Sequence, residues 1–170
     1  MTLTEKFRGK KIRWIKESVF SREFKLLSDN ENIGELRFPK FFSTTATIKL
    51  LDHEWEAYSP SMFKSRMELK DKRTGVILAT LKVEKVFGGS EIFVGDKKFI
   101  FSNSLFNRKF FIKNDSDAIQ LEFEMNSWFK TQAEVKVEPV FIQKEEFPVL
   151  LAFVWYLIIR ISERHAAAAA

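Results

Sequence analysis

Histidine carries much of the acid–base and metal chemistry of proteins near neutral pH, and this chain has only two histidines. His53 lies in the segment Asp52-His-Glu-Trp-Glu56, where two-residue alternation places the imidazole on one strand face and the carboxylates on the other. A metal ion needs ligands that converge on one point, and these diverge. His165 directly precedes a run of alanines and belongs with that tail. We therefore predict no metal site and no catalytic histidine.

Carboxylates and glycines also form patterns, but none of them fits a catalytic motif. Glu122 and Glu124 share a face, as a glycosidase pair would, yet that face is the polar side of a regular strand. The segment Gly88-Gly89-Ser90 lacks the lysine and the following helix of a phosphate-binding loop. The absence of cysteine excludes thiolate nucleophiles, disulfides and thiolate metal sites. We predict a protein without a cofactor and without a catalytic constellation, and keep an unrecognised enzyme as an alternative.

Clustered basic side chains are the remaining feature with a chemical use. Residues 6–16 interleave lysine and arginine with Phe7 and Trp14, a mixture suited to anionic membrane surfaces, where aromatic rings lie at the level of the headgroups. A second basic cluster lies at a predicted turn near residue 72. The candidate residues for binding a lipid headgroup are therefore Lys6, Arg8, Lys10, Lys11, Arg13, Lys70, Lys72 and Arg73.

The overall charge balance is only mildly basic. The chain has 28 Lys and Arg against 23 Asp and Glu, a formal net charge of +5 over 170 residues. Acidic residues offset the basic ones on most predicted strands, so we expect no nucleic-acid partner. Because lysine and arginine gather at turns in any soluble protein, an ordinary solvated surface is the alternative interpretation of both clusters.

Most of the chain alternates apolar and polar residues with a period of two, which is typical of half-buried antiparallel strands. Turn sequences at 71–75, 95–96 and 114–117 join these strands into hairpins. The pattern predicts about ten to twelve short strands, spaced as in a closed barrel or a sandwich. The residues expected to face inward include Ile77, Ala79, Leu81, Val83, Ile119, Leu121, Phe123, Met125, Val135 and Val137.

An uninterrupted apolar run over residues 147–159 differs from this pattern. Glu146 precedes it and Arg160 follows it, which is the order of charges that a helix dipole favours. A helix of this length covers about 20 Å, less than the roughly 30 Å of a bilayer's hydrocarbon layer. We predict a buried helix at 147–161, and a tail-anchored membrane protein through the same residues is the alternative.

The two kinds of element match in length. A strand of six to eight residues is about 20 to 26 Å long, close to the length of the apolar helix. A helix that is apolar all round needs apolar surroundings, and a closed sheet supplies them while removing its own exposed edges. We predict a mainly β fold, a closed antiparallel β-barrel of about 10–12 strands around a central hydrophobic C-terminal α-helix. The 19 phenylalanines would fill the space between them.

Particular segments also carry a family resemblance. The hairpin Met67-Glu-Leu-Lys-Asp-Lys-Arg-Thr-Gly-Val-Ile-Leu-Ala79, the segment Glu91-Ile-Phe-Val-Gly-Asp96 and the final apolar helix resemble LURP-one-related proteins and phospholipid scramblases. These proteins share the tubby-like barrel with the tubby C-terminal domain, and the likeness covers about residues 20–164. The resemblance implies a non-enzymatic binding domain, which in tubby reads phosphoinositide headgroups.

These observations give an expected organisation. We expect one domain over residues 1–165, with a basic lead-in at 1–19, strands at 20–142 and the central helix at 145–164, followed by an alanine tail at 166–170. The N-terminal residues contain no apolar run of a secretory signal, so we expect a cytoplasmic protein, peripheral at the membrane when it binds lipid. The expected function is binding of anionic phospholipid headgroups, and a protein-interaction scaffold is the alternative.

Overall fold

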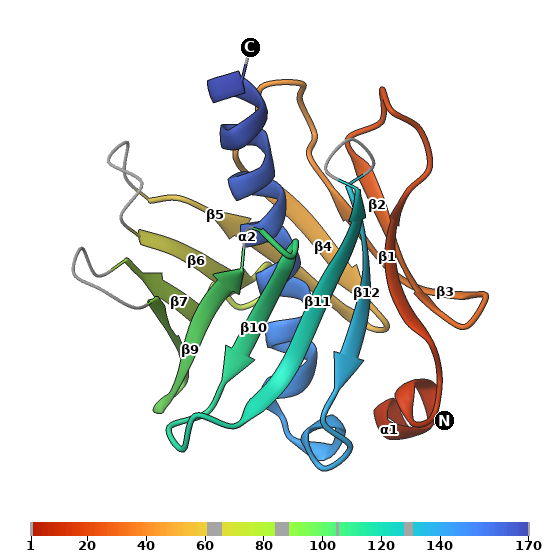
Figure 1. Ribbon diagram of the computed structural model, residues 1–170, viewed down its shortest axis with the longest axis vertical. Helices are drawn as coiled ribbons and strands as arrows, with labels where there is room; N and C mark the ends of the chain where they lie inside the picture. The colour runs from red at the N-terminus through yellow and green to blue at the C-terminus, as the bar shows by residue number, and fades with distance from the viewer. Residues whose placement is uncertain (1, 61–65, 84–88, 105, 128–130, 170) are drawn as a thin grey trace.

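The computed structural model describes residues 2–60, 66–83, 89–104, 106–127 and 131–169. Twelve antiparallel strands follow one another as a meander, and β1 pairs with β12 to close the barrel (Figure 1). The predicted closed barrel is therefore confirmed. The strands are β1 (Ile12–Lys16), β2 (Glu23–Ser28), β3 (Glu31–Arg37), β4 (Ala46–Leu50), β5 (His53–Tyr58), β6 (Arg66–Asp71), β7 (Ile77–Lys82), β8 (Ser90–Val94), β9 (Lys97–Ser104), β10 (Lys109–Lys113), β11 (Ile119–Ser127) and β12 (Gln132–Val137).

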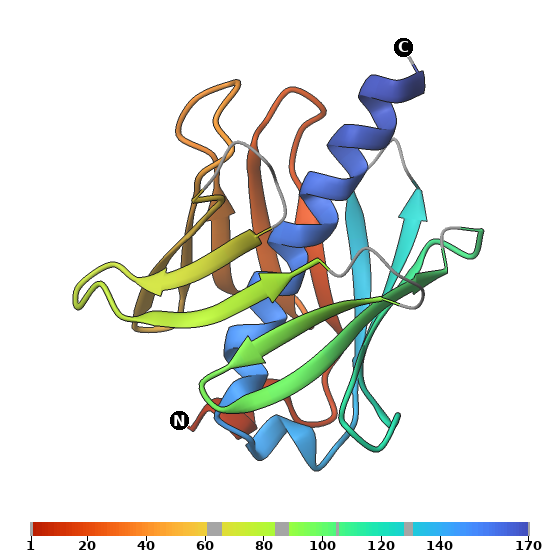
Figure 2. The ribbon, with the colours of Figure 1, turned by 90° about the vertical axis from the view of Figure 1, so that its left-hand side faces the viewer.

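The C-terminal helix α2 (Glu146–Ala169) runs through the barrel (Figure 2). Of residues 147–159, all except Pro148 are buried, so the predicted central helix is confirmed. The helix extends beyond the predicted end at residue 161, because alanine has the highest helix propensity of all residues and the alanine tail continues it. Over the residues that the structure describes, no helix combines the length and the apolarity needed to cross a bilayer.

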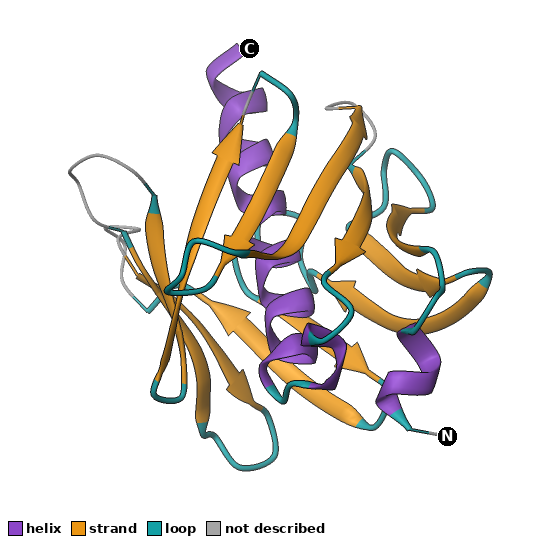
Figure 3. Cartoon of the chain, turned by 60° about the horizontal axis from the view of Figure 1, so that its bottom comes forward, coloured by secondary structure: helices purple, strands orange, loops and turns teal. Residues whose placement is uncertain are grey.

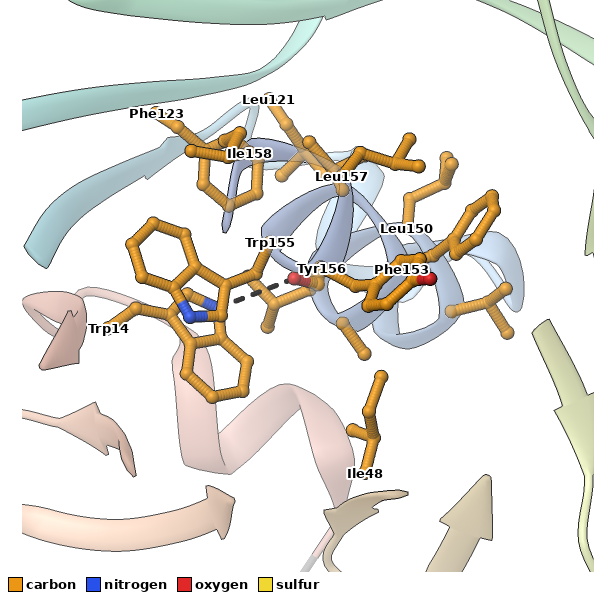
Figure 4. Packing of buried hydrophobic residues seen from close by; sticks show 14 of the residues in the cluster. Trp14, Ile48, Leu121, Phe123, Leu150, Phe153, Trp155, Tyr156, Leu157 and Ile158 are labelled. Atoms are coloured by element: carbon orange, nitrogen blue, oxygen red, sulfur yellow. Dashed lines mark hydrogen bonds between the residues drawn. The ribbon is translucent and has the colours of Figure 1, made fainter. Parts of the chain in front are cut away.

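Aromatic rings join the helix to the wall of the barrel. Trp14 of β1 stacks on Trp155 of α2, with ring centroids 5.8 Å apart and planes 7° from parallel (Figure 4). The Trp14 Nε1–H donates a hydrogen bond to the Leu151 carbonyl at 3.4 Å, which satisfies a buried polar group. Leu121 and Phe123 of β11, a strand that only β12 separates from β1, are fully buried beside the helix (Figure 4). The core thus holds a helix enclosed on all sides by inward-facing strand residues.

Three of the residues expected to face inward are instead exposed, namely Ile77, Val83 and Ile119. Ile77 and Ile119 are the first residues of β7 and β11, and Val83 follows the last residue of β7. The pairing of β7 with β6 and the pairing of β11 with β10 each skip the second residue of the later strand. This β-bulge turns the first residue, Ile77 or Ile119, to the opposite face from the one that strict alternation predicts. In β7 the bulge turns Leu78 toward the core in place of Ile77.

The barrel has two rims that differ in how the chain covers them. We call the end where α2 begins the lower rim and the end where α2 emerges the upper rim (Figure 1). The short helix α1 (Leu3–Phe7) and the 3-10 helix η1 (Phe141–Gln143) lie together at the lower rim (Figure 3). The connections β1–β2 and β3–β4 rise side by side at the upper rim, where they flank the end of α2 (Figures 1 and 2).

Candidate functional site

A hollow of about 470 Å³ opens at the upper rim, between the connections β1–β2 and β3–β4 and the emerging end of α2. Three basic side chains line it: Lys16 from the end of β1, Arg22 from just before β2, and Arg160 from α2. Glu163 is the acidic residue among the lining residues, so positive charge is in excess. Ser21, Ser43 and Thr44 also line the hollow, which therefore offers hydroxyl groups as well as cations.

The two arginines are held by a shared carboxylate. Arg22 Nη2 lies 2.6 Å from Glu163 Oε1, and Arg160 Nη1 lies 2.5 Å from Glu163 Oε2. The guanidinium of Arg22 also lies over the ring of Phe38, 4.4 Å from its centroid. Arg160 Nε is buried and has no hydrogen-bond partner among the described residues. The guanidinium groups thus hold an acidic group already, and one donor of Arg160 is unused.

The wall formed by the β3–β4 connection is fixed to the rest of the site. Arg22 Nη1 donates hydrogen bonds to the carbonyls of Lys40, at 3.3 Å, and Phe41. The Tyr156 hydroxyl of α2 donates to the Thr44 carbonyl at 2.6 Å. Burial raises the pKa of Tyr156 to about 12, so this hydroxyl keeps its proton at physiological pH. The hollow is therefore built by the fold, because the side chains of Arg22, just before β2, and Tyr156 of α2 are hydrogen-bonded to the backbone of the loop.

The environment of Lys16 in the hollow disfavours its charged form. Burial lowers the pKa of Lys16 below its ordinary value, the charge of Arg22 lowers it further, and Glu163 acts in the opposite direction. Partial loss of solvent and a nearby like charge both disfavour the ammonium form. An anion that entered the hollow would favour the charged form of Lys16 and would be attracted by it in return.

Exposed apolar side chains stand on both sides of the hollow. Val19 and Phe20 belong to the β1–β2 connection, and Phe41 and Phe42 belong to the β3–β4 connection. Phe20 is 92% exposed and Phe42 is 89% exposed, although residues of this size are usually buried. The rings of Phe41 and Phe42 pack edge to face on each other, with centroids 4.9 Å apart. The site therefore combines a basic hollow with an apolar border.

The basic residues predicted for the N-terminal segment lie elsewhere and engage in local contacts. Lys6 pairs with Glu31, and Lys11 lies 3.1 Å from Glu134. Arg13 donates to the Asp29 carbonyl and to Asn30 Oδ1. These contacts place the residues on the outer face of β1 and β12 and at the lower rim, where Arg8 and Lys10 also lie, between α1 and β1.

The second predicted cluster lies on another part of the wall. Lys70 of β6 pairs with Glu56 of β5 at 2.9 Å, and Lys72 pairs with Glu54 at 2.7 Å. Arg73 is exposed in the β6–β7 turn. The strands β2 to β5 separate this cluster from β1, so the structure does not bring the two predicted clusters together.

The expectation that Phe7 and Trp14 face a membrane is wrong. Phe7 and Trp14 are each 1% exposed. Phe7 packs edge to face on Phe147 with centroids 5.0 Å apart, and Trp14 stacks on Trp155. A central aromatic helix supplies partners for both rings, which a strand considered alone does not show.

The residues weighed for catalysis have ordinary surroundings. Glu122 lies 3.1 Å from Lys109, and Glu124 lies 3.5 Å from Lys136 on the outer wall. His53 stacks on Trp55 at 5.4 Å. Within the described part of the chain, no group of three histidine or carboxylate residues could hold a metal ion. Gly88 lies outside the described residues.

Comparisons with known proteins bear on the fold. No protein-family model matches the chain, and a comparison with curated proteins finds no match. The X-ray structure of a protein from Arabidopsis thaliana, AT5G01750, is similar, with a TM-score of 0.63 over 93% of this chain and 95% of that chain. The sequence identity is 12%, so the likeness shows a shared barrel fold and nothing about function.

Proposed function

We propose that this protein binds an anionic phospholipid headgroup in the hollow at the upper rim, at the surface of a membrane. The observation that carries the proposal is the meeting of Lys16, Arg22 and Arg160 in one hollow bordered by exposed Phe20 and Phe42. Phosphate esters are recognised by converging arginine and lysine donors. Exposed phenylalanine beside such donors suits a ligand that is held in a lipid layer.

The position of Glu163 supports an anionic ligand. Its carboxylate bridges the guanidinium groups of Arg22 and Arg160, at 2.6 and 2.5 Å, so the two groups are spaced to bind a single acidic group from both sides. A phosphate monoester, such as the one on a phosphorylated inositol, has more acceptor oxygens than a carboxylate and carries more charge, so it would compete for the same donors and engage Lys16 as well.

The apolar border supports a membrane as the source of this anion. A free phosphate compound gains nothing from Phe20, Phe41 and Phe42, which cost solvation free energy in water. A phospholipid brings its headgroup to the basic hollow and its interfacial layer to the phenyl rings. Attachment of this kind is peripheral and is compatible with the expected cytoplasmic location.

We include membership of the tubby-like barrel group in the proposal. The resemblance of residues 67–79 and 91–96 to LURP-one-related and scramblase sequences supports it, and so does the closed barrel around a C-terminal helix. The binding residues proposed for this chain come from its own upper rim.

Vesicle co-sedimentation tests the proposal. The intact protein should sediment with phosphatidylcholine vesicles that contain phosphatidylserine or a phosphorylated phosphatidylinositol, and not with pure phosphatidylcholine. Raising the salt from about 0.1 M to about 1 M shortens the Debye length from about 10 Å to about 3 Å, so the long-range part of the binding should be lost. Failure to sediment with any anionic vesicle at low salt would overturn the proposal.

Matched variants locate the binding. Arg22→Gln combined with Lys16→Gln removes two charges from the hollow, and Lys72→Gln combined with Arg73→Gln removes two charges from the β6–β7 turn. The first pair should weaken binding about tenfold or more, the second by less than about twofold. Equal losses in both pairs would mean that binding follows diffuse surface charge. Thermal unfolding of each variant checks that the barrel is intact.

A protein-interaction scaffold is the second candidate function. The exposed phenylalanines at the upper rim favour it, because apolar surface of this kind is also found where protein partners dock. A scaffold would bind independently of anionic lipid, so absence of vesicle binding together with a stable protein complex through Phe20 or Phe42 would replace the lipid proposal.

A further inference from the structure

Two neighbouring loop tips at the upper rim carry apolar side chains into solvent. The β1–β2 tip exposes Val19 and Phe20 by 70% and 92%, and the β3–β4 tip exposes Phe41 and Phe42 by 71% and 89%. Only the hairpin of β2 and β3 separates the two connections, and both rise at the same end of the barrel (Figures 1 and 2). The four side chains therefore project on the same side of the molecule, on the two flanks of the basic hollow.

Hydrogen bonds fix the conformation of both loop tips. The backbone of the β3–β4 tip accepts hydrogen bonds from Arg22 and from the Tyr156 hydroxyl, and Ser43 N donates to the Lys40 carbonyl at 3.0 Å within the tip. In the β1–β2 tip, Ser21 N donates to the Ser18 carbonyl at 3.1 Å. Both tips are thus compact turns, whose geometry keeps the phenyl rings away from the barrel core.

The charges around the tips are arranged for an anionic layer. Lys16, Arg22 and Arg160 lie between the tips, and Lys40 and Arg164 are exposed beside them. The neighbouring acidic side chains are each engaged by a cation. Glu17 pairs with Lys25, Glu23 with Arg37, and Glu163 with Arg22 and Arg160.

We propose that the two tips insert into the interfacial layer of an anionic bilayer, so that the upper rim faces the membrane and the lower rim faces away from it. This inference rests on the proposed headgroup site, because the inserted tips would bring the hollow to the level of the phosphates. A bilayer fits the surface better than a protein does, since the apolar groups stand on separate projections with cations between them. The end of α2 emerges at the same rim, and its residues 166–168 are alanine, which offers no charge that would oppose contact.

Because the chain has no cysteine, a single introduced cysteine can be labelled specifically, and the orientation of the protein on a membrane can be measured. Phe20→Cys, Phe42→Cys and, as a control at the lower rim, Val140→Cys each give one site for an environment-sensitive fluorophore. Val140 is 60% exposed, so its label is also accessible. With phosphatidylserine-containing vesicles, the labels at 20 and 42 should shift to the blue and be quenched by a quencher carried on the lipid chains. The label at 140 should do neither.

A second measurement separates insertion from headgroup binding. Phe20→Ser combined with Phe42→Ser should weaken vesicle binding by roughly tenfold for each ring, from partial burial of phenyl surface. Binding of a water-soluble inositol phosphate should weaken far less, because Lys16, Arg22 and Arg160 are all kept and only two apolar side chains at the border of the hollow are shortened. If the labels at 20 and 42 stay in water while the protein still sediments, the insertion is wrong and the headgroup site stands. If the label at 140 shifts as much as the others, the orientation is wrong. If no anionic vesicle binds, both proposals fail.

Discussion

Phenylalanines lie at both rims of the barrel, but they are buried at the lower rim and exposed at the upper rim. At the lower rim, Phe7 of α1 and Phe141 of η1 pack on Phe147 of α2, with centroids 5.0 and 6.1 Å from its ring. At the upper rim, Phe20 and Phe42 project into solvent. The lower rim shows that short helices in this chain can cover a barrel end. The exposed rings at the upper rim therefore need a reason other than the geometry of a closed sheet.

The two rims also differ in how their basic side chains are paired with carboxylates. At the lower rim, Lys6 and Lys97 each have a carboxylate partner, in Glu31 and Glu146. At the upper rim, Arg22 and Arg160 share Glu163, and no carboxylate of the described residues lies within ion-pair distance of Lys16. Lys6 and Lys97 at the lower rim are thus paired one to one, whereas at the upper rim three cations lie around one carboxylate, beside exposed apolar groups.

The largest expected effect on stability comes from removing α2, the helix that extends from one rim to the other. A chain that stops at Glu146 loses the buried side chains of α2 and leaves the inward faces of the strands without a partner. We expect no cooperative thermal unfolding, measured by circular dichroism, and aggregation during purification. Removal of residues 166–170 alone should have little effect. A soluble, cooperatively unfolding protein that ends at residue 146 would contradict the central role given to the helix.

Paired alanine substitutions test the contrast between the rims directly. Phe147→Ala should lower the free energy of unfolding by about 3 to 5 kcal/mol, because it removes a fully buried ring. Phe42→Ala should change it by less than about 0.5 kcal/mol, because that ring is exposed. Denaturant unfolding of both variants measures the difference. Comparable losses would mean that the upper-rim ring is also part of the core.

A third substitution sharpens the electrostatic difference. Glu163→Gln removes the carboxylate that the two arginines share, and should strengthen binding to anionic vesicles about fivefold at low salt. The physical reason is that the neutral amide no longer repels an incoming phosphate. A lipid titration measures the change, with Glu31→Gln at the lower rim as the matched control. Weaker binding by Glu163→Gln would show that the carboxylate positions the arginines and does not compete with the ligand.

The smallest expected effect is a dependence on pH. The pKa of Lys16 lies below its ordinary value of 10.5, so this side chain loses its charge earlier than a solvated lysine as the pH rises. Anion binding should weaken as the pH approaches 10.5, and Lys16→Arg should remove this dependence because arginine stays charged. Titrations with anionic vesicles at several alkaline pH values measure it. An unchanged pH profile in Lys16→Arg would place the responsible group elsewhere.

The barrel and its central helix could be predicted because their signals are local. Alternation in residues such as Leu121 and Phe123 reveals a strand face, and the apolar run at 147–159 reveals a buried helix. The bulges beside Ile77 and Ile119 could not be predicted, since they arise from pairing between strands. In β7 and β11 the alternation therefore fails at the first residue of the strand and holds from Ala79 and Leu121 onward.

The hollow could not be predicted from neighbouring residues, because its cations come from segments far apart in sequence. Lys16 and Arg22 meet Arg160 only after β1 and α2 are packed. A usable signal was present in the connections, which are normally polar. The β1–β2 and β3–β4 connections each contain an apolar residue followed by phenylalanine, namely Val19-Phe20 and Phe41-Phe42.

The order of elements along the chain also constrains how the protein is made. The helix at the centre of the barrel follows all twelve strands in the sequence, and the seam joins Ile12 to Val135. A ribosome therefore releases every inward-facing strand residue before the segment that covers it. The barrel can close only when β1 pairs with β12, which is far away in the sequence. Contacts between such distant segments make folding slow, and intermediates with exposed apolar surface can aggregate during synthesis. We therefore expect the nascent chain to be most prone to aggregation until its final helix is complete.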